Sequence, residues 1–334
     1  MTPQALRQQL NQLKPLALGE FPTPLASLPR LSAALGGPEL WIKRDDLSGL
    51  GLGGNKIRKL RYLLAEALRH KANVVLTAGA QQSNHARQTA AAAASVGLRA
   101  VLVLRGEAPH SIPDGNYLLD HFFGAEVRWA GERLLSPALH AEAAHLRQAG
   151  ARPYIIPYGG SNALGACGFV AGLVELVQQA APRELLFDAI IVASSSGGTQ
   201  AGLTVGAQLL SLPTRIIGIS IDKPAATFRQ QLATLATETA FLLNSPATFA
   251  PADFTVVDSY LGGGYGVVGE LERQAIRLLA RTEGLLTDPV YTGRALGGLV
   301  DLLEQGTFAA DARLLFWHTG GSPSLFAYAE ELLA

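Results

Sequence analysis

The sequence predicts an α/β fold with two domains, each built around a mainly parallel sheet flanked by helices. Short apolar segments alternate with longer helical patterns along the 334 residues, and such alternation is typical of α/β proteins. Most of the short segments are continuously apolar, as expected for parallel strands covered on both faces. They are more numerous than the strands of one compact sheet, so we expect two sheets.

The predicted elements follow one another in the order strand, then helix, over most of the chain. The predicted strands are Glu39–Lys43, Asn73–Thr77, Ala100–Leu104, Glu126–Trp129, Pro153–Pro157, Ala189–Ala193, Ile216–Ile221, Thr255–Asp258 and Leu314–Trp317. The predicted helices include Lys56–Arg69, Ala86–Val96, Leu135–Ala149, Leu164–Ala180, Gln200–Leu210 and Gly269–Glu283. Met1–Lys14 is polar and helix-like, and His110–Gly115, with its Pro-containing turns, is the expected exposed loop.

The composition excludes several classes of protein. Hydrophobic residues make up 48% and charged residues 16%, with a formal net charge of zero, which indicates a globular chain with a large core. No basic block stands out, so we expect no nucleic-acid partner. The single cysteine, Cys167, excludes an internal disulfide and a Cys-based zinc cluster. Apolar stretches are short and nothing resembles a signal peptide, so we expect no membrane span and a cytoplasmic location.

One lysine, Lys56, lies where a glycine-rich loop meets the start of a predicted helix. The segment 47–60 reads LSGLGLGGNKIRKL, and the chain has only six lysines among its 27 basic residues. Lysine can lose its proton in a buried site and arginine cannot. A chain that uses arginine almost everywhere but places a lysine here is therefore expected to need a reactive amine at this point.

The glycines of this loop also match a nucleotide-binding pattern, but weakly. Gly49, Gly51 and Gly54 fit G-x-G-x-x-G, yet no acidic residue follows at the distance needed to hold a ribose. A phosphate-binding Walker loop requires Gly-Lys-Ser/Thr, whereas Asn55 precedes Lys56 here. We therefore expect no nucleotide site in this loop.

Two further polar, glycine-rich segments follow predicted strands, where open α/β sheets bind ligands. Gly79–His85 could hold an anion on its backbone amides, although an ordinary turn with Ser83 or Asn84 as the helix N-cap is favoured for this segment taken alone. Ser194–Thr199 consists of six small or hydroxyl-bearing residues before a helix, which favours a phosphate cradle over an unspecific turn.

A third such segment, His318–Pro323, could close the ring end of a cofactor pocket or only turn the chain. A lone histidine such as His318 is more often structural than catalytic. A lysine beside a separate phosphate cradle, without a cluster of metal ligands, indicates pyridoxal phosphate as the cofactor and no metal site. That cofactor needs a lysine for a Schiff base, an anion cradle for its phosphate and a partner for its ring nitrogen.

Five separated motifs resemble the 1-aminocyclopropane-1-carboxylate deaminase/D-cysteine desulfhydrase family, which also contains L-cysteate sulfo-lyase. The resemblance covers the chain from about Leu25 to Tyr328. It implies fold type II of the pyridoxal-phosphate enzymes, the tryptophan-synthase β-like fold, and a homodimer. Within it we expect a larger cofactor-binding domain, 1–55 plus 160–334, and a smaller domain, 56–159. The motifs are Gly53–Leu60, Ala80–Gln88, Gly159–Gly165, Asp288–Gly293 and His318–Gly321.

The resemblance assigns roles to residues of three motifs. It makes Lys56 the Schiff-base lysine. Ser83, Asn84 and His85 match the loop that grips the substrate carboxylate, with Asn84 also near the ring hydroxyl of the cofactor. The phosphate loop corresponds to Ser196, Gly197, Gly198 and Thr199.

Further roles fall on residues near the ring and the reacting end of the substrate. Tyr291 matches a tyrosine stacked near the cofactor ring, and Tyr265 one that faces the reacting end of the substrate. Thr319 belongs to the motif that closes the cofactor pocket. Lys59, one turn beyond Lys56, adds positive charge near the phosphate or is an exposed helix lysine.

Thr292 distinguishes members of the resembled family. The deaminases that open a cyclopropane ring have a glutamate at this place, which keeps the ring nitrogen protonated, whereas this chain has threonine, as the desulfhydrases do. A neutral hydroxyl stabilises a pyridinium less than a carboxylate does. The resemblance therefore implies β-elimination from a small amino acid, with D-cysteine favoured. L-cysteate sulfo-lyase, deaminase activity and a non-catalytic pyridoxal-phosphate-binding protein remain open.

Overall fold

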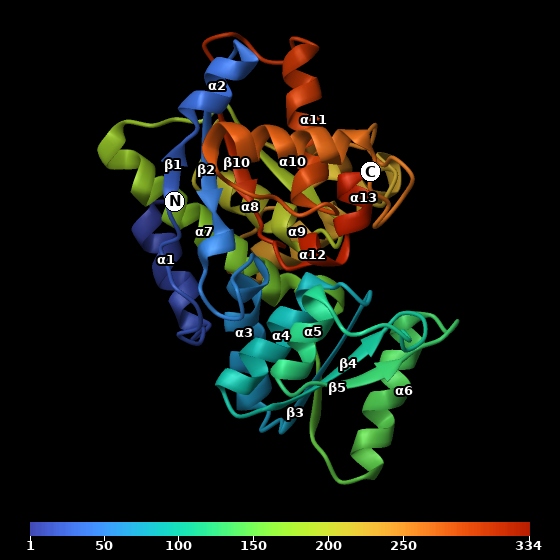
Figure 1. Cartoon of the computed structure of the whole chain (residues 1–334). Helices are drawn as coiled ribbons and strands as arrows, with labels where there is room; N and C mark the ends of the chain where they lie inside the picture. Colours follow the sequence, from blue (N-terminus) through green and yellow to red (C-terminus); the bar gives the residue numbers. More distant parts are fainter.

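The computed structural model describes residues 1–334 and divides them into a larger and a smaller part, each built around its own sheet (Figure 1). The sheet of the larger part has six strands in the order β1-β2-β10-β7-β8-β9. All neighbours are parallel except β1, which is antiparallel to β2. The strands are β1 (Leu25–Ser27), β2 (Glu39–Arg44), β7 (Ala189–Ser194), β8 (Arg215–Ser220), β9 (Thr255–Val257) and β10 (Arg313–His318).

The sheet of the smaller part has four parallel strands in the order β5-β4-β3-β6. Its central strands β3 and β4 are buried along almost their whole length, which explains their continuously apolar sequence. The strands are β3 (Val74–Gly79), β4 (Arg99–Leu104), β5 (Glu126–Trp129) and β6 (Pro153–Ile155).

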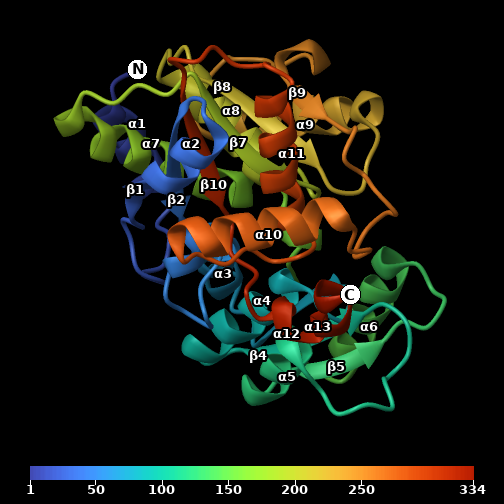
Figure 2. The same cartoon turned by 45° about the horizontal axis from the view of Figure 1, so that its top comes forward.

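Helices cover both sheets, and α3 lies where the two parts meet (Figures 1 and 2). The α-helices are α1 (Pro3–Gln12), α2 (Pro29–Leu35), α3 (Lys56–Arg69), α4 (Asn84–Ser95), α5 (Gly115–Phe122), α6 (Leu135–Gln148), α7 (Ala163–Ala180), α8 (Gly198–Leu209), α9 (Ala225–Leu242), α10 (Glu270–Glu283), α11 (Thr292–Glu304), α12 (Ser324–Ala327) and α13 (Ala329–Leu333). Short 3₁₀ turns are η1 (Asp45–Leu47), η2 (Tyr158–Gly160), η3 (Ala181–Arg183) and η4 (Pro251–Asp253).

The predicted alternation of strands and helices is confirmed, with shifts at several ends. All nine predicted strands are present, whereas the three-residue edge strand β1 was not predicted. The strand predicted over Pro153–Pro157 ends at Ile155, because the chain then turns into η2. The helix expected from Gln200 begins two residues earlier, at Gly198, because Gly197 turns the chain with a φ of 92°. The loop before α5 is exposed as expected, with Ile112 87% accessible.

Helix α7 packs against α1, α3, α8 and α9. Its length and hydropathy would allow it to cross a membrane, but 72% of its most apolar 18-residue stretch is buried inside the fold. Two neighbouring helices approach it closely. A Cβ atom at Gly168 would lie 2.2 Å from the carbonyl oxygen of Arg58 on α3, and one at Gly202 on α8 would lie 2.3 Å from that of Ala166. Glycine at these points therefore sets the distances between the three helices.

A buried network of charges fastens α3 to the larger part. Arg58 donates to Asp45 at 2.8 Å and to Glu175 on α7 at 2.9 and 3.0 Å. Lys43 on β2 donates to the same carboxylate of Glu175 at 2.5 Å. Trp317 on β10 donates to Asp45 at 2.8 Å. Each buried charge thus has an opposite charge and further hydrogen bonds, as such groups require.

Candidate functional site

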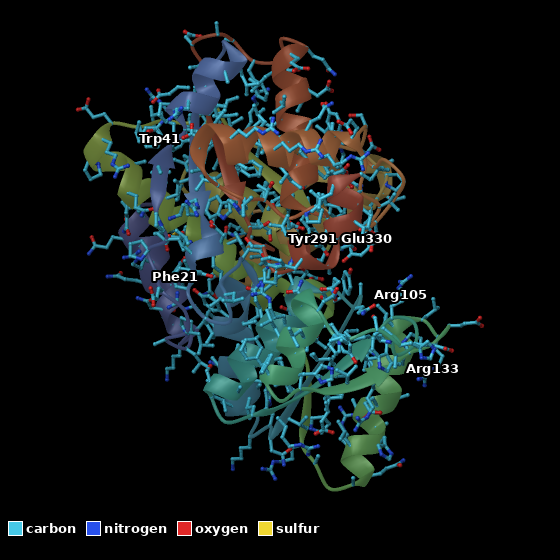
Figure 3. The ribbon with its side chains drawn as sticks, in the orientation of Figure 1. Phe21, Trp41, Arg105, Arg133, Tyr291 and Glu330 are labelled. Atoms are coloured by element: carbon cyan, nitrogen blue, oxygen red, sulfur yellow. The ribbon has the colours of Figure 1, made fainter.

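A cavity of about 590 Å³, its mouth included, lies between the two parts, at the carboxyl ends of β3, β7 and β10. This is the position at which open α/β sheets bind ligands. Figure 3 shows Tyr291, one of its lining residues, where the two parts meet. The lining consists of Asn55, Lys56, Ser83, Asn84, His85, Tyr158, Gly159, Ala193, Ser194, Ser195, Ser196, Gly197, Thr199, Tyr291 and Thr319.

Lys56 is the first residue of α3 and lies in the wall of this cavity. Its backbone amide donates to the side-chain oxygen of Gln88 on α4 at 3.0 Å, and that of Ile57 donates to the same atom at 3.3 Å. Gln88 thus caps α3. Gly54 leaves room for it, since a Cβ atom there would lie 2.4 Å from the Gln88 amide nitrogen. Burial lowers the pKa of Lys56 to about 8, which favours the reactive neutral amine.

Ser196, Gly197, Gly198 and Thr199 lie at the N-terminus of α8, where the sequence predicts a phosphate cradle. A helix N-terminus with free amides and hydroxyls is suited to an anion. The hydroxyl of Ser161 organises the cradle, because it donates to Ser196 Oγ at 2.8 Å and accepts from the amide of Gly198 at 3.1 Å. Ser196, Gly197 and Thr199 line the cavity, whereas Gly198 lies behind them.

Lys59 is buried, so the alternative that it is an exposed helix lysine is wrong. Its Nζ atom donates to Ser161 Oγ at 2.9 Å and to the carbonyl of Gly159 at 3.0 Å, directly behind the cradle. It forms no salt bridge with any carboxylate. Burial, with a further contribution from Lys56, lowers the pKa of Lys59 well below its usual value. A phosphate in the cradle would supply the missing negative charge.

Ser83, Asn84 and His85 lie together at the start of α4. Ser83 caps the helix as expected, because its hydroxyl accepts from the amide of Ala86 at 3.1 Å. The same residue also lines the cavity. The oxygen of the Asn84 side chain accepts from Asn116 Nδ2 at 2.9 Å. That bond leaves the amide NH₂ of Asn84 as the group available to a ligand.

His85 is buried, and only one of its two ring nitrogens has a hydrogen-bond partner within the chain. Its Nε2 atom lies 2.8 Å from Thr77 Oγ1, while Nδ1 is buried without a partner in the chain. Burial, followed by the positive charges of Lys56 and Lys59, lowers the pKa of His85 well below its ordinary value. The ring is therefore neutral at physiological pH.

Two tyrosines meet at the other side of the cavity. The hydroxyl groups of Tyr265 and Tyr291 are 2.8 Å apart, and their rings are arranged edge to face with centroids 5.9 Å apart. Burial raises the pKa of both phenols, so both stay protonated. Tyr291 lines the cavity, whereas Tyr265 reaches it through the shared hydrogen bond.

Thr292 and Thr319 occupy different positions relative to the cavity. Thr319 is in its wall. Thr292 is fully buried behind it, and its hydroxyl donates to Asp288 Oδ1 at 2.6 Å and accepts from the amide of Asp288 at 2.8 Å. Close by, a Cβ atom at Gly321 would lie 2.6 Å from Asp288 Cβ, so this turn requires glycine.

The structure adds Tyr158 to the predicted lining and gives particular contacts to Asn55 and Ser194, which lie in the predicted motifs. Tyr158 follows the last strand of the smaller sheet, and Asn55 donates to Thr199 Oγ1 at 3.2 Å, joining the lysine loop to the cradle. Ser194 contributes a buried hydroxyl without a partner. Asn55 directly precedes Lys56 in the sequence, so its position near the site could be expected. The sequence pattern around Tyr158 gave no indication that this residue lines the cavity.

Known proteins share this chain's sequence over almost its whole length. The profile of the pyridoxal-phosphate dependent enzyme family matches residues 16–320. A D-cysteine desulfhydrase of Yersinia enterocolitica is 45% identical over 97% of this chain and 98% of its own length. A D-cysteine desulfhydrase of Klebsiella pneumoniae is 44% identical over 96% and 98%.

Solved structures show the same architecture. The crystal structure of an ACC deaminase homologue superposes with a TM-score of 0.90, is 40% identical and covers 100% of this chain and 99% of its own. Diaminopropionate ammonia lyase from Escherichia coli, at 17% identity and a TM-score of 0.71, covers 98% of this chain and 92% of its own and shares the fold. The predicted type II fold and cofactor are thus confirmed: this chain belongs to the pyridoxal-phosphate dependent enzyme family.

Proposed function

We propose that this protein is a lyase that catalyses β-elimination from a small amino acid, with D-cysteine as the favoured substrate and pyruvate, hydrogen sulfide and ammonia as products. The observation that carries the proposal is the Lys56 amine, with its pKa near 8, in one cavity with an anion cradle and with Tyr291, whose hydroxyl is hydrogen-bonded to that of Tyr265. The names of the relatives that are 44–45% identical favour D-cysteine.

The residues of the cavity fit pyridoxal phosphate. Lys59 has a buried amine without a carboxylate partner behind the cradle, and Ser194 has a buried hydroxyl without a partner in the cavity wall. Both are groups that a phosphate would satisfy. We assign the phosphate to the Ser196–Thr199 cradle, the covalent attachment to Lys56, and the ring to the side of Tyr291. The bound cofactor withdraws electrons from the Cα atom of the substrate and so makes its proton acidic.

Side chains of this protein would then move the protons and hold the substrate. Lys56 Nζ takes the Cα proton, since a neutral amine with a pKa near the working pH is an efficient base. Ser83 and the Asn84 amide hold the substrate carboxylate, with neutral His85 behind them. Tyr265, protonated and bonded to Tyr291, delivers a proton toward the departing sulfur. Ser83 as a second base on the opposite face is the alternative to its role as an anchor.

Thr292 supports elimination over ring opening. We place it near the ring nitrogen of the cofactor, where its hydroxyl, already bonded to Asp288, offers no carboxylate charge of its own. A less protonated ring draws less charge from the substrate, and a carbanion with a good β-leaving group expels that group. L-Cysteate sulfo-lyase and 1-aminocyclopropane-1-carboxylate deaminase are the competing activities, and cofactor binding without turnover is the competing class.

One set of assays separates these functions. Purified enzyme is given D-cysteine, L-cysteine, L-cysteate, β-chloro-D-alanine and 1-aminocyclopropane-1-carboxylate in parallel, and the 2-oxo acid and ammonia are measured. The proposal expects fastest turnover with D-cysteine and its chloro analogue. Lys56→Ala should abolish turnover, with Lys14→Ala as the matched control. A visible cofactor spectrum that no amino acid alters would instead support binding alone.

We also propose that the chain works as a cytoplasmic homodimer, with a cofactor-binding domain of residues 1–55 plus 160–334 and a smaller domain of residues 56–159. The division is supported by the strands, because β3 to β6 all fall within 56–159 and the six strands of the other sheet all fall outside it. Light scattering of the purified enzyme tests the dimer, and limited proteolysis tests the division.

A further inference from the structure

A second cavity adjoins the cofactor cavity on its outer side. Its volume, with its mouth included, is about 1510 Å³, and both parts of the chain contribute to its wall. One side is apolar and the rest carries charged or polar groups. Figure 3 shows Arg105 at the margin of the smaller part, next to the region where the two parts meet. The lining consists of Ala78, Ala80, Arg105, Leu135, Ser136, Leu139, His140, Ile155, Pro157, Tyr158, Asp222, Lys223 and Tyr265.

Only a thin partition separates the two cavities. Tyr158 lines both of them. Tyr265 lines the outer cavity, and its hydroxyl is 2.8 Å from that of Tyr291 in the inner one. Ser195 of the inner cavity donates to Asp222 of the outer one at 3.1 Å. The outer cavity thus begins beside Tyr265, at the residue that we assign to the reacting end of the substrate.

Tyr158 is the part of this partition with the least support from the rest of the chain. The residue is 40% exposed, and its hydroxyl makes no hydrogen bond within the chain. The other members of the partition are held by hydrogen bonds to one another. The ring of Tyr158 therefore stands between the two cavities, and no hydrogen bond fixes its hydroxyl.

The charges of the outer cavity leave one cation free. Lys223 Nζ donates to the carbonyl of Ser195 at 2.5 Å. The negative charge of the neighbouring Asp222 stabilises its positive charge. The side chain of Arg105 forms neither a salt bridge nor a hydrogen bond within the chain. A free guanidinium is the side chain best suited to bind a carboxylate with two hydrogen bonds.

We propose that the outer cavity is an extension of the substrate site that takes S-substituted cysteines whose substituent ends in an anion. The inference rests on the proposed β-elimination and specifies its substrate class. The thioether chain passes Tyr158 and lies against the apolar wall formed by Leu135, Leu139 and Ile155. Its terminal carboxylate binds Arg105.

The reaction with such a substrate balances without any oxidant or reductant. Lys56 removes the Cα proton, the Cβ–S bond breaks, and sulfur leaves with the electron pair as a thiolate, which is then protonated. The remaining three-carbon enamine takes up water to give pyruvate and ammonium. With S-carboxymethylcysteine the thiol product is thioglycolate, and the other products are the same as those from cysteine.

The test compares D-cysteine with two isosteric substrates, S-carboxymethyl-D-cysteine, which is anionic, and S-carbamoylmethyl-D-cysteine, which is neutral. Pyruvate and free thiol are measured for the wild type, Arg105→Ala, Arg105→Lys and Arg133→Ala. We expect kcat/KM of the wild type to be about tenfold higher for the carboxymethyl than for the carbamoylmethyl compound, as one charge-assisted hydrogen bond allows. Arg105→Ala should remove this ratio, Arg105→Lys should keep part of it, and Arg133→Ala should leave it unchanged.

Other results overturn the inference. Turnover of D-cysteine without turnover of either S-substituted compound refutes the extension, while absence of D-cysteine turnover refutes the underlying function instead. An Arg105→Ala enzyme that loses the same factor with all three substrates would show that Arg105 supports activity in general and does not bind the terminal carboxylate. Tyr158→Ala provides a second reading, because it should raise kcat/KM for both S-substituted compounds relative to D-cysteine. A fall in that ratio contradicts the assigned passage.

Discussion

The hydroxyl groups of Tyr265 and Tyr291 share a hydrogen bond of 2.8 Å at the boundary between the cofactor cavity and the outer cavity. Because both phenols have raised pKa values, the pair is neutral and one proton always lies between the two oxygens. A neutral pair of this kind can deliver a proton to a departing thiolate and recover it from solvent.

Replacing Tyr265 by phenylalanine removes this proton while keeping the ring. We expect kcat to fall by about 100-fold, the lower range for loss of a general acid, with little change in cofactor affinity. Tyr260→Phe is the control, since its hydroxyl donates to Asp301, which does not line the cavity. β-Chloro-D-alanine tests the role of this proton, because chloride leaves without being protonated. The steady-state turnover of this substrate should therefore fall less than that of D-cysteine. An equal loss with both substrates would contradict the assignment.

Lys59→Met removes the buried amine behind the phosphate cradle, which a bound phosphate would keep protonated. Since no carboxylate compensates Lys59, its charge is available to the cofactor phosphate through Ser161. We expect affinity for pyridoxal phosphate to fall at least about tenfold, as for loss of one charge-assisted hydrogen bond. Fluorescence titration of cofactor-free protein measures this, and pyridoxal without phosphate serves as the matched ligand. Equal weakening for both ligands would show general damage to the site instead.

The capture of the cofactor should depend on pH through Lys56. Its pKa is lowered to about 8 from an ordinary value of 10.5, so the neutral amine that attacks an aldehyde predominates above pH 8. The rate at which cofactor-free protein binds pyridoxal phosphate covalently should therefore rise with pH and level off above about 8. Stopped-flow absorbance between pH 6.5 and 10.5 gives the midpoint. A midpoint near 10.5 would refute the effect of burial.

Glu175→Gln should destabilise the fold strongly. The change leaves Lys43 and Arg58 buried with one carboxylate fewer, and breaking such a pair typically costs about 3–5 kcal/mol. The pKa of Glu175 is lowered from 4.5 to about 2, chiefly by Arg58 and Lys43 against the opposing effect of burial. Its contribution to the free energy of unfolding is therefore complete above about pH 4.5 and lost as pH falls toward 2.

Denaturant unfolding at pH 7 and pH 3 measures both effects. The variant should lose less stability than the wild type between these two values, because it lacks the titrating carboxylate. Glu304→Gln, at an exposed position, is the control and should unfold like the wild type. Equal acid sensitivity of the wild type and Glu175→Gln would place the titrating groups elsewhere.

The sequence predicted the parts of the site that have a local signal. Lys56 stands at a glycine-rich loop before an amphipathic helix, and the helix predicted from it has the observed ends, Lys56–Arg69. The Ser194–Thr199 segment carries its signal in six small residues before a helix. In both cases, the composition of one short segment determines the local backbone conformation.

The remaining parts depend on contacts between distant segments. Helix geometry placed Lys59 near Lys56, but its burial results from η2 packing over it. Asn116, 32 residues further along the chain, orients Asn84. Tyr158 lines the cavity only because the two parts of the chain meet there. Such relationships have no periodicity or motif of their own in one sequence.

Lys56 is held from two directions, by Gln88 of α4 at its backbone amide and, through Arg58, by the charge network of the larger part. Gln88 belongs to the same helix as Asn84, so the reactive amine is fixed relative to the wall that carries Ser83 and Asn84. Through Arg58 it is also fixed relative to the larger part. Loosening either attachment would therefore shift the nucleophile away from one wall of the cavity, even though the altered residue need not touch the ligand.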